Sequence, residues 1–285
     1  LSTQINSSKV NTVYALSYTN PYYTVDGVSR GFDLYKRNVD PTSLSIGQYR
    51  TSTLGGLMRF GVPVTELDTI HLGVGAEATA LTVYSDSPQR FIDFANTFGT
   101  NTTALLGNLG WARDGRDSLI YTTRGRVQRV SIETALPGGS LKYYKGSYQH
   151  QWFYPVVRDL TLMLNGEIGI GGGYGDKPLP FFKNFYAGGV SSVRGYQTSS
   201  LGPKDTNGDP RGGTRRVVGN AELLFPFPGL TNDRSLRLSA FLDTGMVDDS
   251  FHGSFRQSTG MALSWISPVG PLKVSIAKPL NSQPD

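Results

Sequence analysis

The stretch Asn184–Pro203 reads NFYAGGVSSVRGYQTSSLGP, and it lies between segments in which apolar and polar residues alternate. Its single arginine belongs to the tetrapeptide Val193-Arg194-Gly195-Tyr196 and is surrounded by glycines and small residues, which form helices poorly. This combination is typical of a long loop, with exposed backbone, inside a membrane β-barrel. A guanidinium is a planar fork of five donors that suits carboxylates. The stretch therefore predicts that Arg194 meets acidic side chains near the loop.

The composition agrees with one large β domain or two small ones. The chain has 285 residues with 35 glycines, 15 tyrosines and 14 phenylalanines, and it has no cysteine. The lack of cysteine excludes a disulfide scaffold and thiolate metal sites. The net charge is +5, but lysines and arginines occur one or two at a time rather than in clusters. Nucleic acid is therefore not expected as a partner, because its binding relies on basic patches.

Alternation with a period of two recurs along the chain and predicts β-strands. Between Leu160 and Asn165, for example, leucines hold every even position. If such strands form a barrel in a membrane, Leu162, Leu164 and Leu238 face hydrocarbon, and Met163, Asn165 and Ser239 face the lumen. The predicted strands are 1–8, 11–23, 27–38, 49–61, 68–84, 100–114, 124–136, 141–155, 159–174, 214–226, 234–247, 255–267 and 271–280.

The connections between these strands differ in length. Short connections are predicted at 25–27, 62–68, 123–125, 155–159, 226–233 and 267–271, and longer ones at 39–48, 85–99, 175–213 and 248–254. Tight turns at one end and long loops at the other are typical of outer-membrane barrels. The longest connection, 175–213, is expected to fold back into the lumen, because loops of this length are usually functional or disordered.

A membrane location does not require a long apolar segment in this fold. A barrel strand needs only about 9–11 residues, half of them polar, whereas a spanning helix needs roughly 20 apolar residues, and no such run occurs. Several predicted strands are also longer than the five or six residues usual in soluble proteins. A soluble sandwich or propeller remains the alternative, since it also alternates. Aromatic residues at strand ends could form interfacial girdles, namely Tyr22, Tyr23, Trp152, Phe153, Tyr154, Phe225, Phe227 and Trp265.

Two carboxylates are the candidate partners of Arg194. Glu222 and Asp243 both fall on the polar face of the two strands that follow the longest connection. A half-buried charge needs partners, and these are the nearest downstream carboxylates with inward parity. The alternative interpretation is a solvated loop arginine, which is the usual state of an exposed arginine.

No catalytic residue, metal site or cofactor is expected. The three histidines, His71, His150 and His252, lie far apart in the sequence. A hydrolase built on the barrel wall would need a serine beside a histidine on one face, but Ser147 and His150 have opposite parity. The acidic segment Asp205–Asp209 has proline where a calcium loop needs glycine, and it is interpreted as a turn.

Four motifs, in order along nearly the whole chain, resemble the barrel domain of the BamA family of outer-membrane protein assembly factors. They are Thr19–Val28, Asn108–Trp111 with Arg124-Gly125, Phe182–Gly189 leading into Val193–Tyr196, and Trp265–Leu272. The arginine motif alone is shared with related POTRA-barrel families, including the two-partner secretion transporters. The early turn and the last hairpin favour the assembly-factor family.

The resemblance implies a transmembrane, antiparallel up-and-down β-barrel of sixteen strands, of which about thirteen lie in this chain. Residues 1–285 would then be a fragment of that domain, with the POTRA domains, the first strands and the last strand outside it. The implied protein is an integral, multi-pass protein of the outer membrane of a Gram-negative bacterium. It assembles and inserts nascent β-barrel proteins, and an incoming strand adds to an edge that opens between the first and last strands.

The resemblance also implies a set of partners. These are the outer-membrane lipid bilayer, nascent outer-membrane β-barrel proteins, and the accessory lipoproteins of the BAM complex, the last mainly through the POTRA region. No covalent chemistry is implied. The loop motif around Arg194 would pair with Glu222 and Asp243 in the lumen. The alternative function is a polypeptide-transport pore of the two-partner secretion type.

Overall fold

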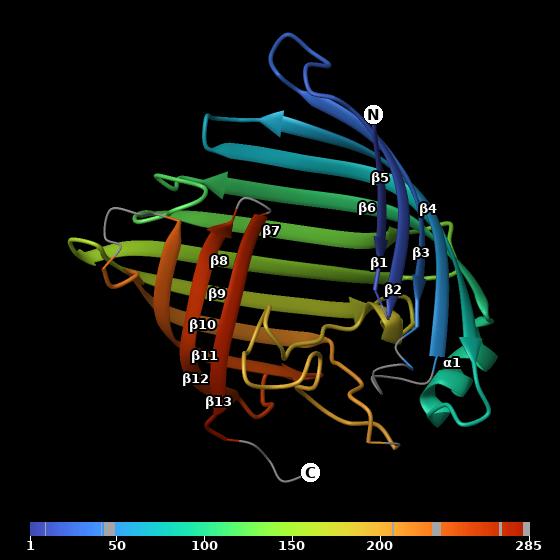
Figure 1. The fold of residues 1–285 in the computed structure, drawn as a ribbon. Helices are drawn as coiled ribbons and strands as arrows, with labels where there is room; N and C mark the ends of the chain where they lie inside the picture. The colour runs from blue at the N-terminus through green and yellow to red at the C-terminus, as the bar shows by residue number, and fades with distance from the viewer. Residues whose placement is uncertain are drawn as a thin grey trace.

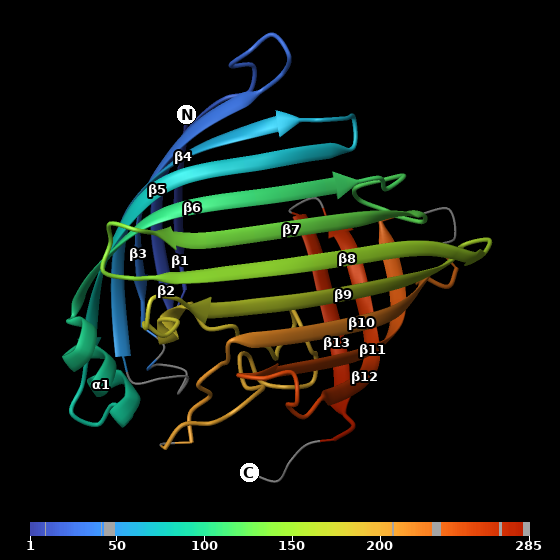
Figure 2. The same ribbon diagram turned by 180° about the vertical axis from the view of Figure 1, so that it is seen from behind.

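The computed structural model describes residues 1–8, 10–40, 42, 49–206, 208–229, 235–267 and 270–281. They form one antiparallel sheet of 13 strands, in which each strand pairs with its neighbours along the chain. The sheet curls strongly, so that it has a concave inner face and a convex outer face (Figures 1 and 2). The predicted all-β, up-and-down architecture is confirmed.

The observed strands coincide with the predicted segments to within a few residues. They are β1 (Ser2–Ser7), β2 (Asn11–Asn20), β3 (Ser29–Val39), β4 (Tyr49–Pro63), β5 (Asp68–Val83), β6 (Asn101–Asp114), β7 (Gly125–Leu136), β8 (Tyr143–Val157), β9 (Leu160–Gly173), β10 (Arg215–Pro226), β11 (Leu236–Asp248), β12 (Arg256–Ser267) and β13 (Gly270–Pro279). β1 and β13 are the two ends of the sheet. Among the described residues, no helix is long and apolar enough to cross a membrane.

Side-chain exposure follows the alternation that the sequence predicts. On β9, Leu164 is exposed on the outer face, while Met163 is buried on the inner face. On β11, Ser239 is buried, and Leu238 has the opposite parity. The outer face of the sheet is thus predominantly apolar and the inner face mixed, as a barrel wall in a membrane requires.

The connection 85–99 contains a helix, α1 (Gln89–Phe98), that the alternation does not predict. Its phenylalanines recur at helical spacing, and Phe91 and Phe94 are buried. The Phe91 ring centroid lies 5.2 Å from that of Tyr49 on β4 and 4.3 Å from that of Phe181. The helix therefore exists because this aromatic cluster gives it an apolar face to pack against. It lies at one end of the sheet, which we call the loop end (Figure 1).

The longest connections lie at the loop end, as predicted, but each end of the sheet has exceptions. Connections 8–10 and 137–142 at the loop end are short. At the opposite turn end, connections 21–28 and 115–124 are longer than the predicted 25–27 and 123–125, so those two predictions are wrong.

A contact with β11 explains why the connection 115–124 is long. Its Tyr121 and Thr122 meet Arg237 on β11, whose Nη1 donates to the Thr122 carbonyl at 2.6 Å. The Arg237 guanidinium carbon also lies 4.2 Å from the centre of the Tyr121 ring. The turn therefore reaches from β6 and β7 to the opposite side of the sheet, which a tight turn could not do.

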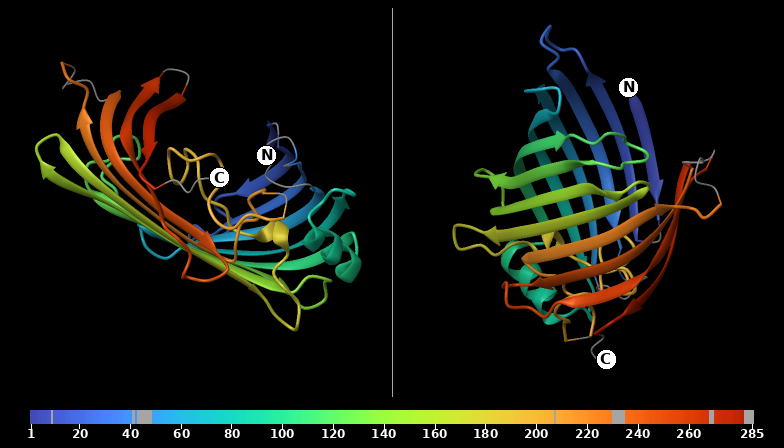
Figure 3. Two further views of the ribbon diagram at one scale, coloured as in Figure 1. Left: turned by 90° about the horizontal axis from the view of Figure 1, so that it is seen from below. Right: turned by 90° about the vertical axis from the view of Figure 1, so that its left-hand side faces the viewer.

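The connection 175–213, here called the inner loop, folds back over the concave face (Figure 3). Phe185 and Gly213, the last residue of the loop, are joined by a pair of backbone hydrogen bonds at 2.8 and 3.0 Å. The glycine-rich end of β9 makes room for it. A Cβ at Gly169 would meet the Phe185 ring, and one at Gly173 would overlap the carbonyl of Lys177.

Candidate functional site

The backbone of the inner loop turns sharply on glycines before and after Arg194. Gly188, Gly189 and Gly195 have φ angles of 112°, 91° and 89°, a region that residues with a Cβ rarely adopt. The Ser192 hydroxyl accepts a hydrogen bond from the Gly188 amide at 2.8 Å and fixes the turn. Val193 is fully buried at Gly245 of β11, where a Cβ would meet its side chain. This local structure aims Arg194 at the wall.

Arg194 and Asp243 form a bidentate ion pair. Arg194 Nε donates to Asp243 Oδ2 and Nη2 donates to Oδ1, each at 2.7 Å. The backbone amide of Arg194 also donates to Asp243 Oδ2, at 3.0 Å. Arg194 is 6% exposed and Asp243 0%. The carboxylate thus holds both the side chain and the backbone of the loop tip.

Glu222 on β10 provides the second carboxylate. Arg194 Nη1 donates to Glu222 Oε1 at 3.2 Å, and the Ser239 hydroxyl donates to the same oxygen at 2.5 Å. Lys273 on β13 adds a second cation, with Nζ at 3.0 Å from Oε1. Two cations and two carboxylates therefore balance. Arg194 and both carboxylates are buried and Lys273 is half-exposed, so no buried charge is left unpaired.

The surroundings keep the Arg194 guanidinium charged. Its carbon lies 3.4 Å from the centre of the Phe241 ring, a stacked cation–π contact. Burial by itself would lower the pKa of Arg194, but the hydrogen bond with Asp243 and the charges of Glu222 and Asp243 outweigh burial and raise that pKa. The guanidinium of the anchor therefore keeps its charge.

A row of amides supports Asp243 from the side. Asn220 Nδ2 donates to Asp243 Oδ1 at 2.9 Å and also contacts the Ser192 carbonyl of the loop at 2.8 Å. Asn165 on β9 donates to the Asn220 side-chain oxygen at 2.9 Å, and Gln149 on β8 donates to Asn165 at 2.9 Å. The inner face from β8 to β11 thus forms one hydrogen-bonded row that ends at the ion cluster.

The two residues after Arg194 contact the last strands of the sheet. Tyr196 donates a hydrogen bond from its hydroxyl to the Gln257 carbonyl of β12 at 2.9 Å. A Cβ added to Gly195 would lie 3.2 Å from Cβ of Ala277 on β13 and 3.4 Å from Cβ of Ser258. Glycine at 195 therefore meets two demands, a positive φ and close approach to the wall.

A second ionic contact holds the loop to the opposite side of the sheet. Lys183 Nζ lies 3.2 Å from Glu77 Oε2 on β5 and 3.0 Å from Glu133 Oε1 on β7. Tyr35 and Tyr143 donate to these two carboxylates at 2.5 and 2.7 Å. Among the described residues, the ion pairs between the inner loop and the strands thus lie at two places, which we call the Arg194 anchor and the Lys183 anchor.

The structure brings all six residues singled out in the sequence to one region. The contacts of Arg194 with both Glu222 and Asp243 are present, and Val193, Gly195 and Tyr196 pack around them. Sequence reasoning missed Lys273, Ser239, Asn220 and Phe241. The inward parity of Ser239, Asn220 and Phe241 marks them as facing the lumen, but parity does not predict which inward residues meet the loop.

The other residues considered as possible catalytic or metal-binding groups do not come together. His71 lies on β5, His150 on β8 and His252 in the connection after β11. In the segment predicted to be a turn, the Asp209 amide donates to the Asp205 side chain at 3.0 Å, while residue 207 lies outside the described residues. Within the described ranges, no group of three or more His, Asp or Glu side chains is placed to hold a metal ion. What the site can do chemically is hold a loop against a wall by charge.

Comparisons with known proteins give a consistent assignment. A family model described as the Omp85 superfamily domain matches residues 1–285. The chain is 40% identical to the outer membrane protein assembly factor BamA of Neisseria meningitidis, over 98% of this chain and 40% of that relative. It therefore spans about two fifths of the relative's length.

Solved structures agree with the fold. The crystal structure of BamA from Haemophilus ducreyi lacking POTRA domains 1–3 matches with a TM-score of 0.92 at 25% identity, over 99% of this chain and 61% of that one. CdiB from Acinetobacter baumannii matches with a TM-score of 0.60 at 12% identity, over 95% of this chain and 47% of that one, which is a likeness of fold alone.

Proposed function

The chain belongs to the Omp85 superfamily, and on that basis we propose that it is the membrane barrel of an outer-membrane protein assembly factor. In this role it assembles and inserts nascent β-barrel proteins into the outer membrane of a Gram-negative bacterium. The observation that carries the proposal is the 40% identity to the Neisseria assembly factor over 98% of this chain.

The geometry of the site supports this function in a second way. The chain has an apolar outer face suited to a bilayer and an inner face occupied by an anchored loop. The described residues around the loop tip contact it through ion pairs, amide hydrogen bonds and an aromatic ring. These contacts hold the loop in place and involve no covalent reaction. The proposal therefore needs no catalytic step: membrane insertion follows from strand pairing and burial of apolar surface.

The proposed partners follow from this role. They are the lipid bilayer of the outer membrane, nascent β-barrel proteins, and accessory lipoproteins that bind mainly outside this chain, on periplasmic POTRA domains. We propose that residues 1–285 are the barrel domain of such a longer protein.

The test is reconstitution of the full-length protein in lipid vesicles. A urea-denatured outer-membrane barrel protein is added as the client. Its folding is followed as the fraction that stays folded in SDS without heating and that resists external protease. We expect vesicles with the protein to fold the client faster than empty vesicles. Equal rates would contradict the proposal. A client that becomes protected inside the vesicles while still unfolded would instead support the transport-pore alternative.

A further inference from the structure

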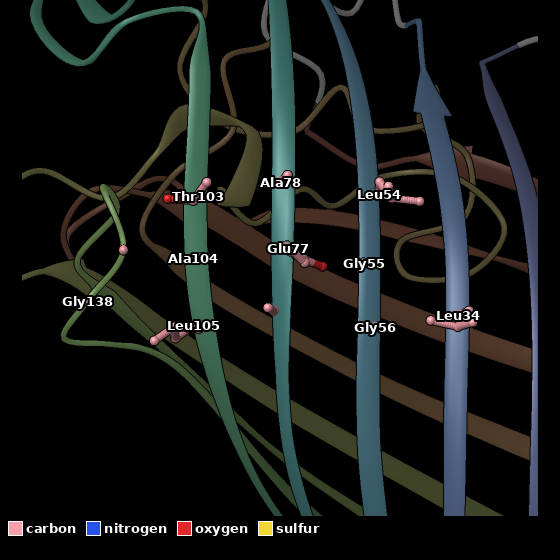
Figure 4. A pocket seen from close by; sticks show the side chains of 12 residues that line it. Leu34, Leu54, Gly55, Gly56, Glu77, Ala78, Thr103, Ala104, Leu105 and Gly138 are labelled. Carbon is pink, nitrogen blue, oxygen red and sulfur yellow. The ribbon is translucent and has the colours of Figure 1, made fainter.

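A shallow apolar groove lies on the outer face of the sheet, away from the inner loop. It has a volume of about 490 Å³ and crosses β3 to β6 near the hairpin at Gly138 (Figure 4). Its sides are three leucines on different strands, Leu34, Leu54 and Leu105, which are 62%, 63% and 42% exposed. We call this feature the outer groove.

The groove is hollow because small residues lie between these leucines. In the sheet register, Leu34 pairs with Gly56, Gly56 with Ala76, and Ala76 with Leu105. One row of the outer face therefore runs from leucine across glycine and alanine to leucine. Ala78 repeats the small floor between Leu54 and Thr103 in the next row.

The outer face becomes polar immediately beside the groove, on its loop-end side. Lys36 pairs in register with Leu54, and its side chain is exposed with outward parity. One row further, the Ser52 hydroxyl donates to Asn38 at 2.8 Å. Among the described residues, no ion pair or hydrogen bond engages the Lys36 ammonium. Nearby Arg50, by contrast, is paired with Asp40 at 2.6 Å.

The groove cannot be a site for adding a strand. β4 and β5 are hydrogen-bonded on both edges, so their backbone groups have no capacity for another chain. An occupant must therefore be recognised by apolar contact and by the charge at Lys36. An apolar hollow beside the Lys36 ammonium, on the outer face of a proposed membrane barrel, matches an amphiphile with an anionic head.

We propose that the outer groove holds an acyl chain of an anionic, phosphate-bearing membrane lipid, with its phosphate at Lys36. The chain fills the hollow over Gly56, Ala76 and Ala78, and the ammonium offsets the headgroup charge. The lipid stays longer there than on a stretch of the wall that lacks either the hollow or the cation. This inference rests on the proposed membrane location but not on the proposed assembly activity.

The test counts lipids that remain bound to the full chain, purified in an uncharged detergent, by native mass spectrometry. Phosphatidylglycerol and phosphatidylcholine of the same acyl length are titrated separately. We expect one phosphatidylglycerol to bind about fivefold more tightly than phosphatidylcholine, the effect of one cation near a lipid phosphate. Equal affinity for the two lipids would overturn the charge recognition.

Variants separate the hollow from the charge. Ala76→Leu with Ala78→Leu fills the groove and should weaken both lipids, whereas Ala240→Leu on the outer face of β11 should weaken neither. Lys36→Gln should bring phosphatidylglycerol to the level of phosphatidylcholine, whereas Lys278→Gln on β13 should not. Heat-modifiable migration on gels verifies that each variant is folded. Unchanged lipid affinity in the variant with the filled groove would refute the proposed lipid site. An equal loss of affinity in a variant and its control would also refute it. Because no client protein is present, failure here is distinct from failure of the assembly proposal.

Discussion

The Arg194 anchor leads to a quantitative prediction for Arg194→Ala. The substitution removes three side-chain hydrogen bonds from two carboxylates that are 0% and 2% exposed. Glu222 keeps Lys273 as a cation, but Asp243 keeps only neutral donors, Asn220 and the backbone amide. Breaking a buried pair costs about 3–5 kcal/mol. We expect about 3 kcal/mol, the low end, because those neutral donors remain.

The lost stabilising free energy should appear as easier opening of the loop tip. Hydrogen exchange measured by mass spectrometry on peptides covering 187–201 reports this directly, since the Leu201 amide is bonded to the Ala187 carbonyl at 3.0 Å. A cost of about 3 kcal/mol corresponds to roughly 100-fold faster exchange. Arg194→Lys should recover only part of it, because an ammonium cannot fork across both carboxylates.

A matched control lies in the same loop. Arg211 pairs with Asp249 at 2.6 Å, but the two side chains are 34% and 44% exposed. Exposed pairs contribute only about 0–1 kcal/mol, so Arg211→Ala should leave the exchange of 187–201 nearly unchanged. Arg194→Ala combined with Asp243→Ala should be little worse than either alone. Exchange in Arg194→Ala within about threefold of the parent would show that the pair does not hold the loop, and the reasoning would fail.

Other changes test other contacts. Lys183→Met should speed exchange in the segment before Tyr186 more than in 187–201, because the ion pairs of Lys183 are with Glu77 on β5 and Glu133 on β7, away from the Arg194 anchor. Uniform acceleration would contradict two separate anchors. Leu164→Arg should destabilise the folded barrel in lipid by roughly 2–4 kcal/mol, and Asn165→Arg much less, measured by urea unfolding in vesicles. Gly245→Val should displace Val193 and lower the thermal midpoint, since a Cβ there meets the Val193 side chain. Burial would raise the pKa of Asp117, but hydrogen bonds from Thr123 and Arg124 outweigh it and lower that pKa. The folded pKa lies below the unfolded one, so this contribution is present above the unfolded pKa and disappears as pH falls through the folded one; Asp117→Asn should flatten the acid limb of a stability–pH curve.

The strands could be predicted because one physical demand governs every one of them. Each side chain on a curved wall must face either outward or inward, so a period of two is imposed along the whole strand. The same parity predicts that Glu222 and Asp243 lie on the inner face, where both are buried. Parity is a property of single strands, and it needs no knowledge of which strands are neighbours across the lumen.

The elements that sequence reasoning missed depend on such neighbours. The helix α1 is stable where Phe91 meets Tyr49 and Phe181, which lie on β4 and in the inner loop. The contact of Lys273 with Glu222 joins β13 to β10, strands that are not adjacent. No local pattern encodes these distances. The spacing of Phe91, Phe94 and Phe98 was nevertheless a helical signal that a search for alternation alone overlooks.

The two anchors make the inner loop a mechanical link between distant parts of one sheet. Lys183 is bonded to β5 and β7, whereas Arg194 is bonded to β10 and β11 and Tyr196 to β12. Between the anchors the chain has only the short segment 184–193, so the two sides cannot separate far without breaking one of them. The Arg194 anchor is bidentate and nearly buried, while Glu133 of the Lys183 anchor is 30% exposed. Water screens the Lys183 anchor more, so a change in curvature of the sheet should release that contact first and leave the loop tip on β10 and β11.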